Sequence, residues 1–290
     1  MNAVDPDVSQ LSETFIGELI KALALPQTDS IRSAFRLAFG RAARRFSELV
    51  LGLDRKIAQG GVASGARWLL PKFVAGYRAR GVEKIPQNGP LLIVSNHPGA
   101  YDAMVISAYM NRPDYKIVIS EIPPYRYLPN VSRHAIFSAP VTNIYGRMHT
   151  VRSAIRHLKT GGALLIFPRG RVEPDPAFMP KPDAEFDQWS RSLEILLRHV
   201  PRCLVLVTLV SGVISPSAMQ HPITLLRKAR PDRQRLAFIY QIFQQVLSGE
   251  ELYGLTPRVT FGEILSGAEH QHLLAKIEQS ARQTLELHLS

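Results

Sequence analysis

Cysteine is almost absent from this sequence, which has one thiol, Cys203, in 290 residues. A single cysteine excludes an internal disulfide framework, and its place in the apolar stretch CLVLVTLV predicts a buried, inert thiol. Long hydrophobic runs are also missing. The most apolar segments, near residues 91–95, 163–167 and 203–210, are far shorter than the roughly 20 residues that a membrane-spanning helix needs. We therefore expect no transmembrane helix.

Targeting and metal-binding signals are missing as well. The first residues, MNAVDPDVSQLSETF, are acidic and polar, without the positive start and apolar stretch of a signal peptide. The histidines show no metal-ligand spacing with cysteines or clustered carboxylates, so we predict neither a metal nor a resident cofactor. These absences favour a cytoplasmic protein, and the sequence does not indicate its oligomeric state.

Positive charge is unevenly distributed along the chain. The sequence has 35 Lys and Arg and 24 Asp and Glu, a net charge of +11, and residues 30–84 contain twelve of the basic and three of the acidic residues. Such an excess indicates an anionic partner: a membrane surface, nucleic acid or a phosphorylated substrate. Between residues 30 and 51, arginines alternate with apolar residues that share one side of a predicted helix: Ile31, Phe35, Phe39, Ala42, Phe46 and Leu49.

This amphipathic pattern has two interpretations. The helix could lie on an anionic lipid surface, or it could dock on the protein's own core with its arginines in water. Nucleic acid is disfavoured, because the basic residues are interleaved with a continuous apolar face and no recognition motif is present. We expect a basic helical segment over residues 1–64 that contacts membrane lipids, and an α/β domain over residues 65–290.

Short apolar runs alternate with helical patterns after residue 84. Strands are predicted at residues 90–95, 115–120, 162–167, 203–210 and 257–265, with helices near 101–111, 148–160 and 187–199 and at the C-terminal end. Residues 122–129 are expected to form an ordered loop. Because most of the strands are continuously apolar, they should be covered on both faces. The sequence therefore predicts an α/β fold with a mostly parallel central sheet flanked by helices.

A histidine and an aspartate follow the first of these strands, in LLIVSNHPGAYDAMV. In a continuous helix, His97 and Asp102 would lie about 140° apart. Pro98 and Gly99 interrupt such a helix and let the chain fold the histidine back toward the aspartate. The pair could then act as a base and the group that orients it.

The third predicted strand also ends in residues that suit a binding site. In open α/β sheets, ligands bind beyond the carboxyl ends of the strands, so this loop and the His97 loop should open onto one crevice. Arginines in the loop, with one from the upstream sequence YGR, could bind an anion. The candidate binding residues are Arg147, Phe167, Pro168, Arg169, Gly170 and Arg171.

Taken in order, these segments resemble the glycerolipid acyltransferase family, which includes lysophosphatidate and glycerol-3-phosphate acyltransferases. The resemblance rests on GVEKIPQNGPLLIVSNHPGAYDAMV, IYGR, GGALLIFPRG and PRVTFGEIL, and covers roughly residues 70–265. It implies that His97 takes a proton from an acceptor hydroxyl that attacks an acyl thioester, while Asp102 orients the imidazole. It further implies that Arg147 binds the acceptor's phosphate. Asn96 and the amides after His97 are candidates for stabilising the oxyanion.

The third block departs from the family pattern F-P-E-G-T-R-S, because Arg169 occupies the place of the glutamate. Three explanations remain open: the acceptor carries extra negative charge, Glu173 or Asp175 supplies the missing carboxylate, or the acceptor is not a glycerol phosphate. The fourth block has VTLVSG where the family has a proline. Both departures concern the acceptor and leave His97 and Asp102 unchanged.

The resemblance implies an acyltransferase that moves a fatty acyl group from acyl-CoA or acyl-carrier protein to a glycerolipid hydroxyl, with lysophosphatidate as the expected acceptor. Peripheral membrane association would bring the enzyme to its lipid substrates. Two alternatives are a non-catalytic lipid-binding protein with a degenerate acyltransferase fold, and a thioesterase in which water replaces the acceptor. The sequence does not distinguish acyl-CoA from carrier protein as the donor.

Overall fold

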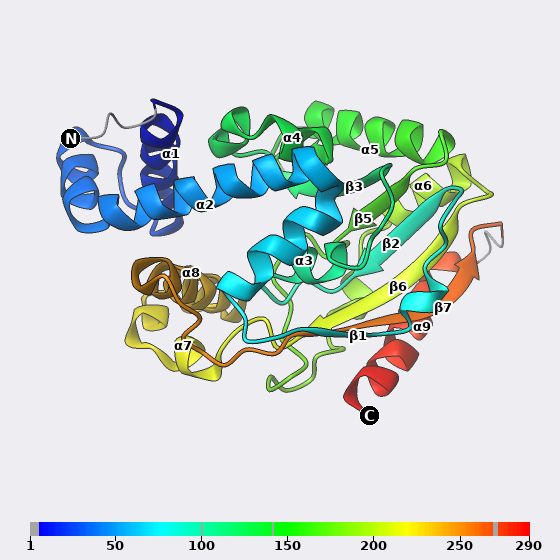
Figure 1. The fold of residues 1–290 in the computed structure, drawn as a ribbon. Helices are drawn as coiled ribbons and strands as arrows, with labels where there is room; N and C mark the ends of the chain where they lie inside the picture. The colour runs from blue at the N-terminus through cyan, green and yellow to red at the C-terminus, as the bar shows by residue number, and fades with distance from the viewer. Residues whose placement is uncertain (1–5, 100, 141, 269–271) are drawn as a thin grey trace.

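The computed structural model describes residues 6–99, 101–140, 142–268 and 272–290. A seven-stranded sheet crosses the molecule in the order β1-β7-β6-β2-β5-β3-β4, with helices around it (Figure 1). Five neighbouring strands, β6 through β4 in this order, run parallel, whereas β7 is antiparallel to β6 and β1 is parallel to β7. The prediction of a mostly parallel sheet flanked by helices is confirmed.

Both faces of the sheet are buried, as the continuously apolar strands indicated. Within β2 (Leu91–Ser95), Leu91 and Ile93 pack on one side, and Leu92 and Val94 on the other. The first side is covered by α2 (Asp29–Leu69), α3 (Asp102–Ser107) and α8 (Arg230–Ser248). The second is covered by α5 (Ile144–Lys159), α6 (Ser192–His199) and α9 (Leu273–Leu289).

The predicted strands are confirmed to within a few residues: β2, β3 (Tyr115–Ser120), β5 (Ala163–Ile166), β6 (Leu204–Ser211) and β7 (Arg258–Ser266). Two short edge strands, β1 (Arg78–Arg80) and β4 (Ala135–Ser138), were not predicted. The prediction of a loop at 122–129 is wrong, because Pro123–Tyr127 forms a 3-10 helix and α4 (Pro129–Arg133) follows it. The short α7 (Pro216–Gln220) precedes α8.

The predicted basic helix lies in the longer part of α2, before a sharp bend at Gly60 and Gly61. After the bend, α2 runs back toward the sheet (Figure 1). Gly61 has a φ of 75° and a ψ of 179°, a conformation that is open almost only to glycine. Beyond the bend, Gly65 lies against Leu53 and Ile57 from before the bend, where any side chain would clash. The predicted boundary at residues 64 and 65 therefore falls inside α2.

A further helix, α1 (Pro6–Ala22), lies against α2. We call α1 and the part of α2 before the bend the N-terminal layer. Ser12 and Ser47 share a hydrogen bond of 3.0 Å, and the rings of Phe15 and Phe46 are 4.7 Å apart. The apolar side of α2 is thus partly covered by the protein itself. None of the described helices is long and apolar enough to span a bilayer.

Several of the arginines that were expected to face lipid have protein partners instead. Arg36 forms an ion pair with Glu13 at 2.7 Å, and Arg44 with Glu48 at 3.2 Å. Arg45 donates to carbonyl oxygens at the end of α8. The helix therefore docks on the protein, as the second interpretation expected. Contact of the helix with lipid stays a prediction.

Candidate active site

The His97 loop connects β2 to α3 and folds back on itself, as the proline and glycine predicted. His97 Nδ1 lies 2.7 Å from Asp102 Oδ2, although five positions separate the residues. Asp102 opens α3 and is only 1% exposed. Its oxygens also accept hydrogen bonds from the backbone N–H groups of Gly99, at 3.1 Å, and Ala103, at 2.6 Å. These bonds fix the carboxylate, and the carboxylate fixes the imidazole.

The imidazole of His97 is held in one plane and remains accessible at its far edge. Its ring lies 4.6 Å from that of Phe167, tilted by 30°, and its side chain is 30% exposed. Burial lowers the pKa of His97, but the charge and hydrogen bond of Asp102 and the charge of Glu173 outweigh burial and raise this pKa above 6.5. With Nδ1–H donating to Asp102, Nε2 is left as the proton acceptor.

A second carboxylate, Glu173, holds the backbone of His97. Its Oε2 accepts the N–H of His97 at 2.9 Å, and its own N–H donates to the carbonyl oxygen of His97 at 2.9 Å. Its Oε1 accepts the indole N–H of Trp189 at 2.9 Å. Because Glu173 is fully buried, its pKa rises to about 7. Of the two carboxylates suggested as replacements for the missing glutamate, the structure brings Glu173 to the histidine.

The other suggested carboxylate, Asp175, serves a neighbouring loop. It is fully buried and accepts hydrogen bonds from the N–H groups of Gly212, Val213 and Ile214 at 2.8, 3.0 and 3.3 Å. Burial raises the pKa of Asp175 despite these bonds. Asp175 therefore fastens the third-block loop to the turn after β6.

Asn96 does not face the crevice, contrary to its expected part in stabilising an oxyanion. It is 1% exposed, its side-chain nitrogen donates to the carbonyl of Val210 at 2.9 Å, and its side-chain oxygen accepts the N–H of Val210 at 2.8 Å. Both polar atoms are thus used to join the ends of β2 and β6. The amides of His97 and Gly99 are likewise bound to carboxylates. We therefore assign Asn96 a structural role.

Arg169 has an acidic partner inside the protein. Its guanidinium lies 3.1 Å from Glu185, which also pairs with Arg230 at 2.5 Å. Because one carboxylate serves two arginines, the charge of Arg169 is paired but the cluster keeps a net positive charge. The adjacent Gly170 adopts a φ of 64° in a tight turn closed by a 3.1 Å hydrogen bond to the carbonyl of Phe167, and Arg171 projects into solvent.

Gln234 of α8 joins the two loops, and sequence reasoning missed it. This fully buried side chain donates to the carbonyl of Pro98 at 2.6 Å and to that of Glu173 at 2.7 Å. Arg230, one turn earlier, donates to the carbonyl of Val172 at 3.0 Å. The N-terminal part of α8 therefore sets the distance between the His97 loop and the third-block loop. A glutamine in an unpredicted helix offered no signal by which it could have been found.

The remaining predicted residues lie around the same edge of the sheet. Pro168 is buried and accepts a hydrogen bond from the N–H of Ser190 at 3.2 Å. Arg147 is exposed in the first turn of α5, the helix that follows β4. Since β4 is three strands from β2, the start of α5 lies about 14 Å across the sheet from the His97 loop. The structure therefore does not bring Arg147 to His97.

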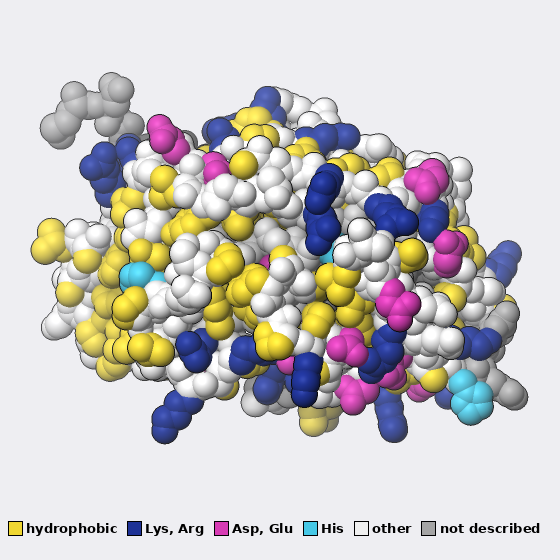
Figure 2. Space-filling model, turned by 90° about the horizontal axis from the view of Figure 1, so that it is seen from below, with side chains coloured by type: hydrophobic (Ala, Val, Ile, Leu, Met, Phe, Trp, Pro, Cys, Tyr) yellow, Lys and Arg dark blue, Asp and Glu magenta, His cyan; other side chains and the backbone are white. Residues whose placement is uncertain are grey.

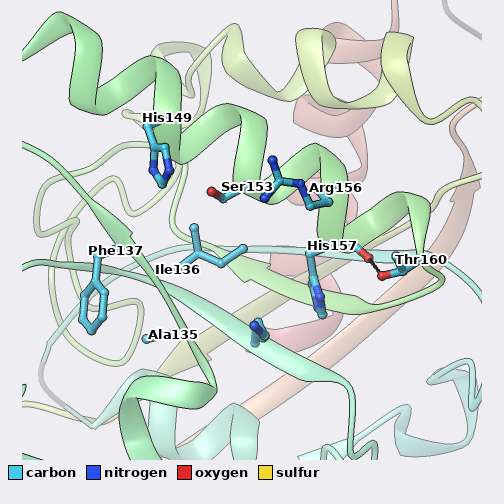
Figure 3. A pocket seen from close by; sticks show the side chains of 9 residues that line it. Ala135, Ile136, Phe137, His149, Ser153, Arg156, His157 and Thr160 are labelled. Carbon is cyan, nitrogen blue, oxygen red and sulfur yellow. Dashed lines mark hydrogen bonds between the residues drawn. The ribbon is translucent and has the colours of Figure 1, made fainter. Parts of the chain in front are cut away.

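A separate hollow of about 440 Å³ lies between α5 and the outer strands β3 and β4 (Figure 3). Lys116, His149, Arg156 and His157 contribute to its lining, which includes none of the predicted site residues. Across the described ranges, no three His, Cys, Asp or Glu side chains gather as a metal site would require. We place the chemistry at the His97 loop, where a base and its orienting carboxylate meet.

A comparison with protein families agrees with the motifs. The family model described as Acyltransferase matches residues 77–187, which include the His97 loop and the third block. The resemblance to acyltransferases is thereby confirmed for this part of the chain. Among solved structures, the chain is similar to the 1-acyl-sn-glycerophosphate (LPA) acyltransferase PlsC from Thermotoga maritima. That match has 15% identity and a TM-score of 0.46, and covers 97% of this chain and 96% of the other. No curated protein matches.

Proposed function

We propose that this protein transfers a fatty acyl group from an acyl thioester to the hydroxyl of a glycerolipid-type acceptor, as in phospholipid biosynthesis or remodelling. The observation that carries this proposal is the His97–Asp102 pair, with its carboxylate buried and its imidazole edge open, inside the region that matches the acyltransferase family. Lysophosphatidate is the acceptor class that we favour, because the family motifs indicate it.

The chemistry needs only the residues of this chain and its two substrates. The acceptor hydroxyl gives its proton to Nε2 of His97 while its oxygen attacks the thioester carbonyl. The resulting imidazolium is stabilised by Asp102 at 2.7 Å. When the tetrahedral intermediate collapses, the C–S bond breaks and the departing sulfur takes the proton from His97. The acyl group passes directly to the acceptor oxygen, so no acyl-enzyme forms.

Free thiol release from palmitoyl-CoA tests this function when it is measured with and without lysophosphatidate, other lysophospholipids and glycerol 3-phosphate. We expect acceptor-dependent release that falls by about 10²–10⁴-fold in His97→Ala, the range for loss of a general base. His199→Ala, at an exposed histidine of α6, is the matched control. Release that needs no acceptor would instead indicate a thioesterase. If folded wild type and mutant both released no thiol from CoA or carrier-protein donors, the protein would be a lipid-binding protein instead.

Membrane association is a second part of the proposal, and we propose a main contact outside α2. Two consecutive leucines, Leu225 and Leu226, are 69% and 64% exposed and are followed by Arg227 and the exposed Lys228. Figure 2 shows apolar side chains gathered on the side of the molecule where α7 and α8 lie. Exposed leucines beside cations suit the interface of an anionic bilayer.

Sedimentation with vesicles tests this contact. Leu225→Ser/Leu226→Ser should bind less to phosphatidylglycerol vesicles than wild type, and binding should weaken with salt because cations contribute to it. Leu252→Ser/Leu289→Ser, at two other exposed leucines, is the control. Unchanged sedimentation of the first variant would contradict the placement.

A further inference from the structure

An apolar cavity lies between the N-terminal layer and α8, and its lining does not include His97. Its volume is about 370 Å³, within the range of small-molecule sites. The consecutive helices α1 and α2 and the distant helix α8 supply nearly all of its wall. The side chains that define it include Phe15 and Leu19 of α1, Ala43 and Phe46 of α2, and Ile239 and Ile242 of α8.

The cavity is elongated along α8, so its two ends can be told apart by the residues of this helix. From Arg235 to Val246 the lining residues of α8 span about 16 Å along the helix axis. At the Val246 end, Arg45 donates to the carbonyl of Val246 at 3.4 Å, and the rings of Phe39 and Phe243 are 5.1 Å apart. This end is therefore formed by α2 packing directly on α8.

The opposite end leads toward the chemistry. Arg235 is exposed and directly follows Gln234, the residue that holds the carbonyl of Pro98 in the His97 loop. Glu18 is the acidic residue in the lining, so the cavity has one charge of each sign. A molecule with an apolar tail along α8 and an anionic head at Arg235 would place that head at the residue next to Gln234.

We propose that this cavity binds the hydrocarbon chain of a lysophospholipid acceptor, with its phosphate toward Arg235. The inference rests on the proposed function and names its acceptor class. The walls favour the acceptor over the donor, because they belong to the basic N-terminal layer and to the helix that follows the exposed leucines, where a membrane lipid would enter. The N-terminal layer then forms part of the substrate site.

Binding measured without turnover tests the proposal independently of catalysis. Native mass spectrometry would compare wild type, Ala43→Phe, which fills the cavity, and Ala38→Phe, the same change at an exposed position of α2. Palmitoyl lysophosphatidate below its micellar concentration and palmitoyl-CoA are the probes, each added alone. We expect Ala43→Phe to weaken lysophosphatidate binding by about tenfold, the effect of roughly two methylene groups losing their buried place. Binding of palmitoyl-CoA, and both probes on Ala38→Phe, should be unchanged.

Each contrary result has a definite meaning. Weaker palmitoyl-CoA binding with unchanged lysophosphatidate binding would assign the cavity to the donor chain and overturn the proposal. Unchanged binding of both probes would exclude the cavity as a lipid site. Should Ala43→Phe fail to fold, Ile239→Ala enlarges the cavity instead, and it should shift binding toward longer lysophosphatidate chains. Absence of acyl transfer would refute the proposed function and leave these binding results to decide on the cavity.

Discussion

The His97 loop and the N-terminal layer are held together by different forces. Around His97, the buried carboxylates of Asp102 and Glu173 accept backbone N–H groups at fixed distances. In the N-terminal layer, aromatic contacts and surface ion pairs join the helices, and an apolar cavity lies beside them. Directional bonds suit a base that must keep one orientation, whereas a looser apolar layer suits lipid chains. Variants in the two regions should therefore fail in different ways.

After the loss of His97 itself, the largest effect is expected at Asp102. Asp102→Asn keeps the shape of the side chain but removes the charge that stabilises the imidazolium, so kcat/KM should fall by about 10²-fold or more. Steady-state kinetics measures the fall, and circular dichroism verifies folding. The control is Asp187→Asn, at an exposed carboxylate. Full activity in a folded Asp102→Asn protein would break the assignment of this loop as the catalytic one.

Glu173→Gln should give a smaller loss together with a shift in pH dependence. A glutamine offers one acceptor where two buried donors, His97 N–H and Trp189 Nε1–H, need partners, which costs about 1–3 kcal/mol of the free energy of unfolding. The raised pKa of His97 means that its neutral base form grows as pH rises above 6.5, so kcat/KM should increase with pH and then level off. Without the charge of Glu173 this pKa falls, and the inflection should move to lower pH.

The pH profile distinguishes this positioning role from a purely structural one. A variant that only loosens the fold would lower activity without moving the inflection. Glu250→Gln, at an exposed position, should leave both unchanged. An inflection that stays in place, or moves to higher pH, in Glu173→Gln would contradict the electrostatic link between Glu173 and His97.

The smallest effect is expected in the N-terminal layer, and it should appear in stability. Gly61→Ala forces a side chain into a backbone conformation suited to glycine and should lower the free energy of unfolding by about 1–3 kcal/mol. Gly40→Ala, in regular helix with only Arg36 Cγ nearby at 3.8 Å, should raise it by about 0.5–1 kcal/mol. Thermal unfolding measures both. A higher free energy of unfolding for Gly61→Ala would show that the bend of α2 is not where the structure places it.

The sequence allowed the His97–Asp102 pairing to be predicted because the two residues are five positions apart, separated by a proline and a glycine. The buried strands were predictable from their continuous apolar character. Gln234 was not, because it reaches the His97 loop across 136 positions. The buried side of its helix, α8, is also hard to recognise from the sequence. Three of the residues on that side are glutamines, Gln234, Gln241 and Gln245, which bind backbone groups of neighbouring segments. Polar residues satisfied in this way look like a solvated face in the sequence.

Arg169 shows a second limit of sequence reasoning. Read alone, it suggested an anion site or an altered acceptor, because its partner carboxylate, Glu185, lies sixteen positions away in a region without a motif. Only the fold shows that Arg169 is paired with Glu185, and that the carboxylate holding the histidine backbone is Glu173.

The central claim is that His97 accepts the proton of a lipid hydroxyl during acyl transfer. The most direct test counts acylated acceptor formed per thiol released, by mass spectrometry of reactions with palmitoyl-CoA and lysophosphatidate. For wild type we predict one acylated acceptor per thiol, and for folded His97→Gln the loss of both products together. Thiol release without acylated acceptor, or equal transfer by the two proteins, would contradict the claim.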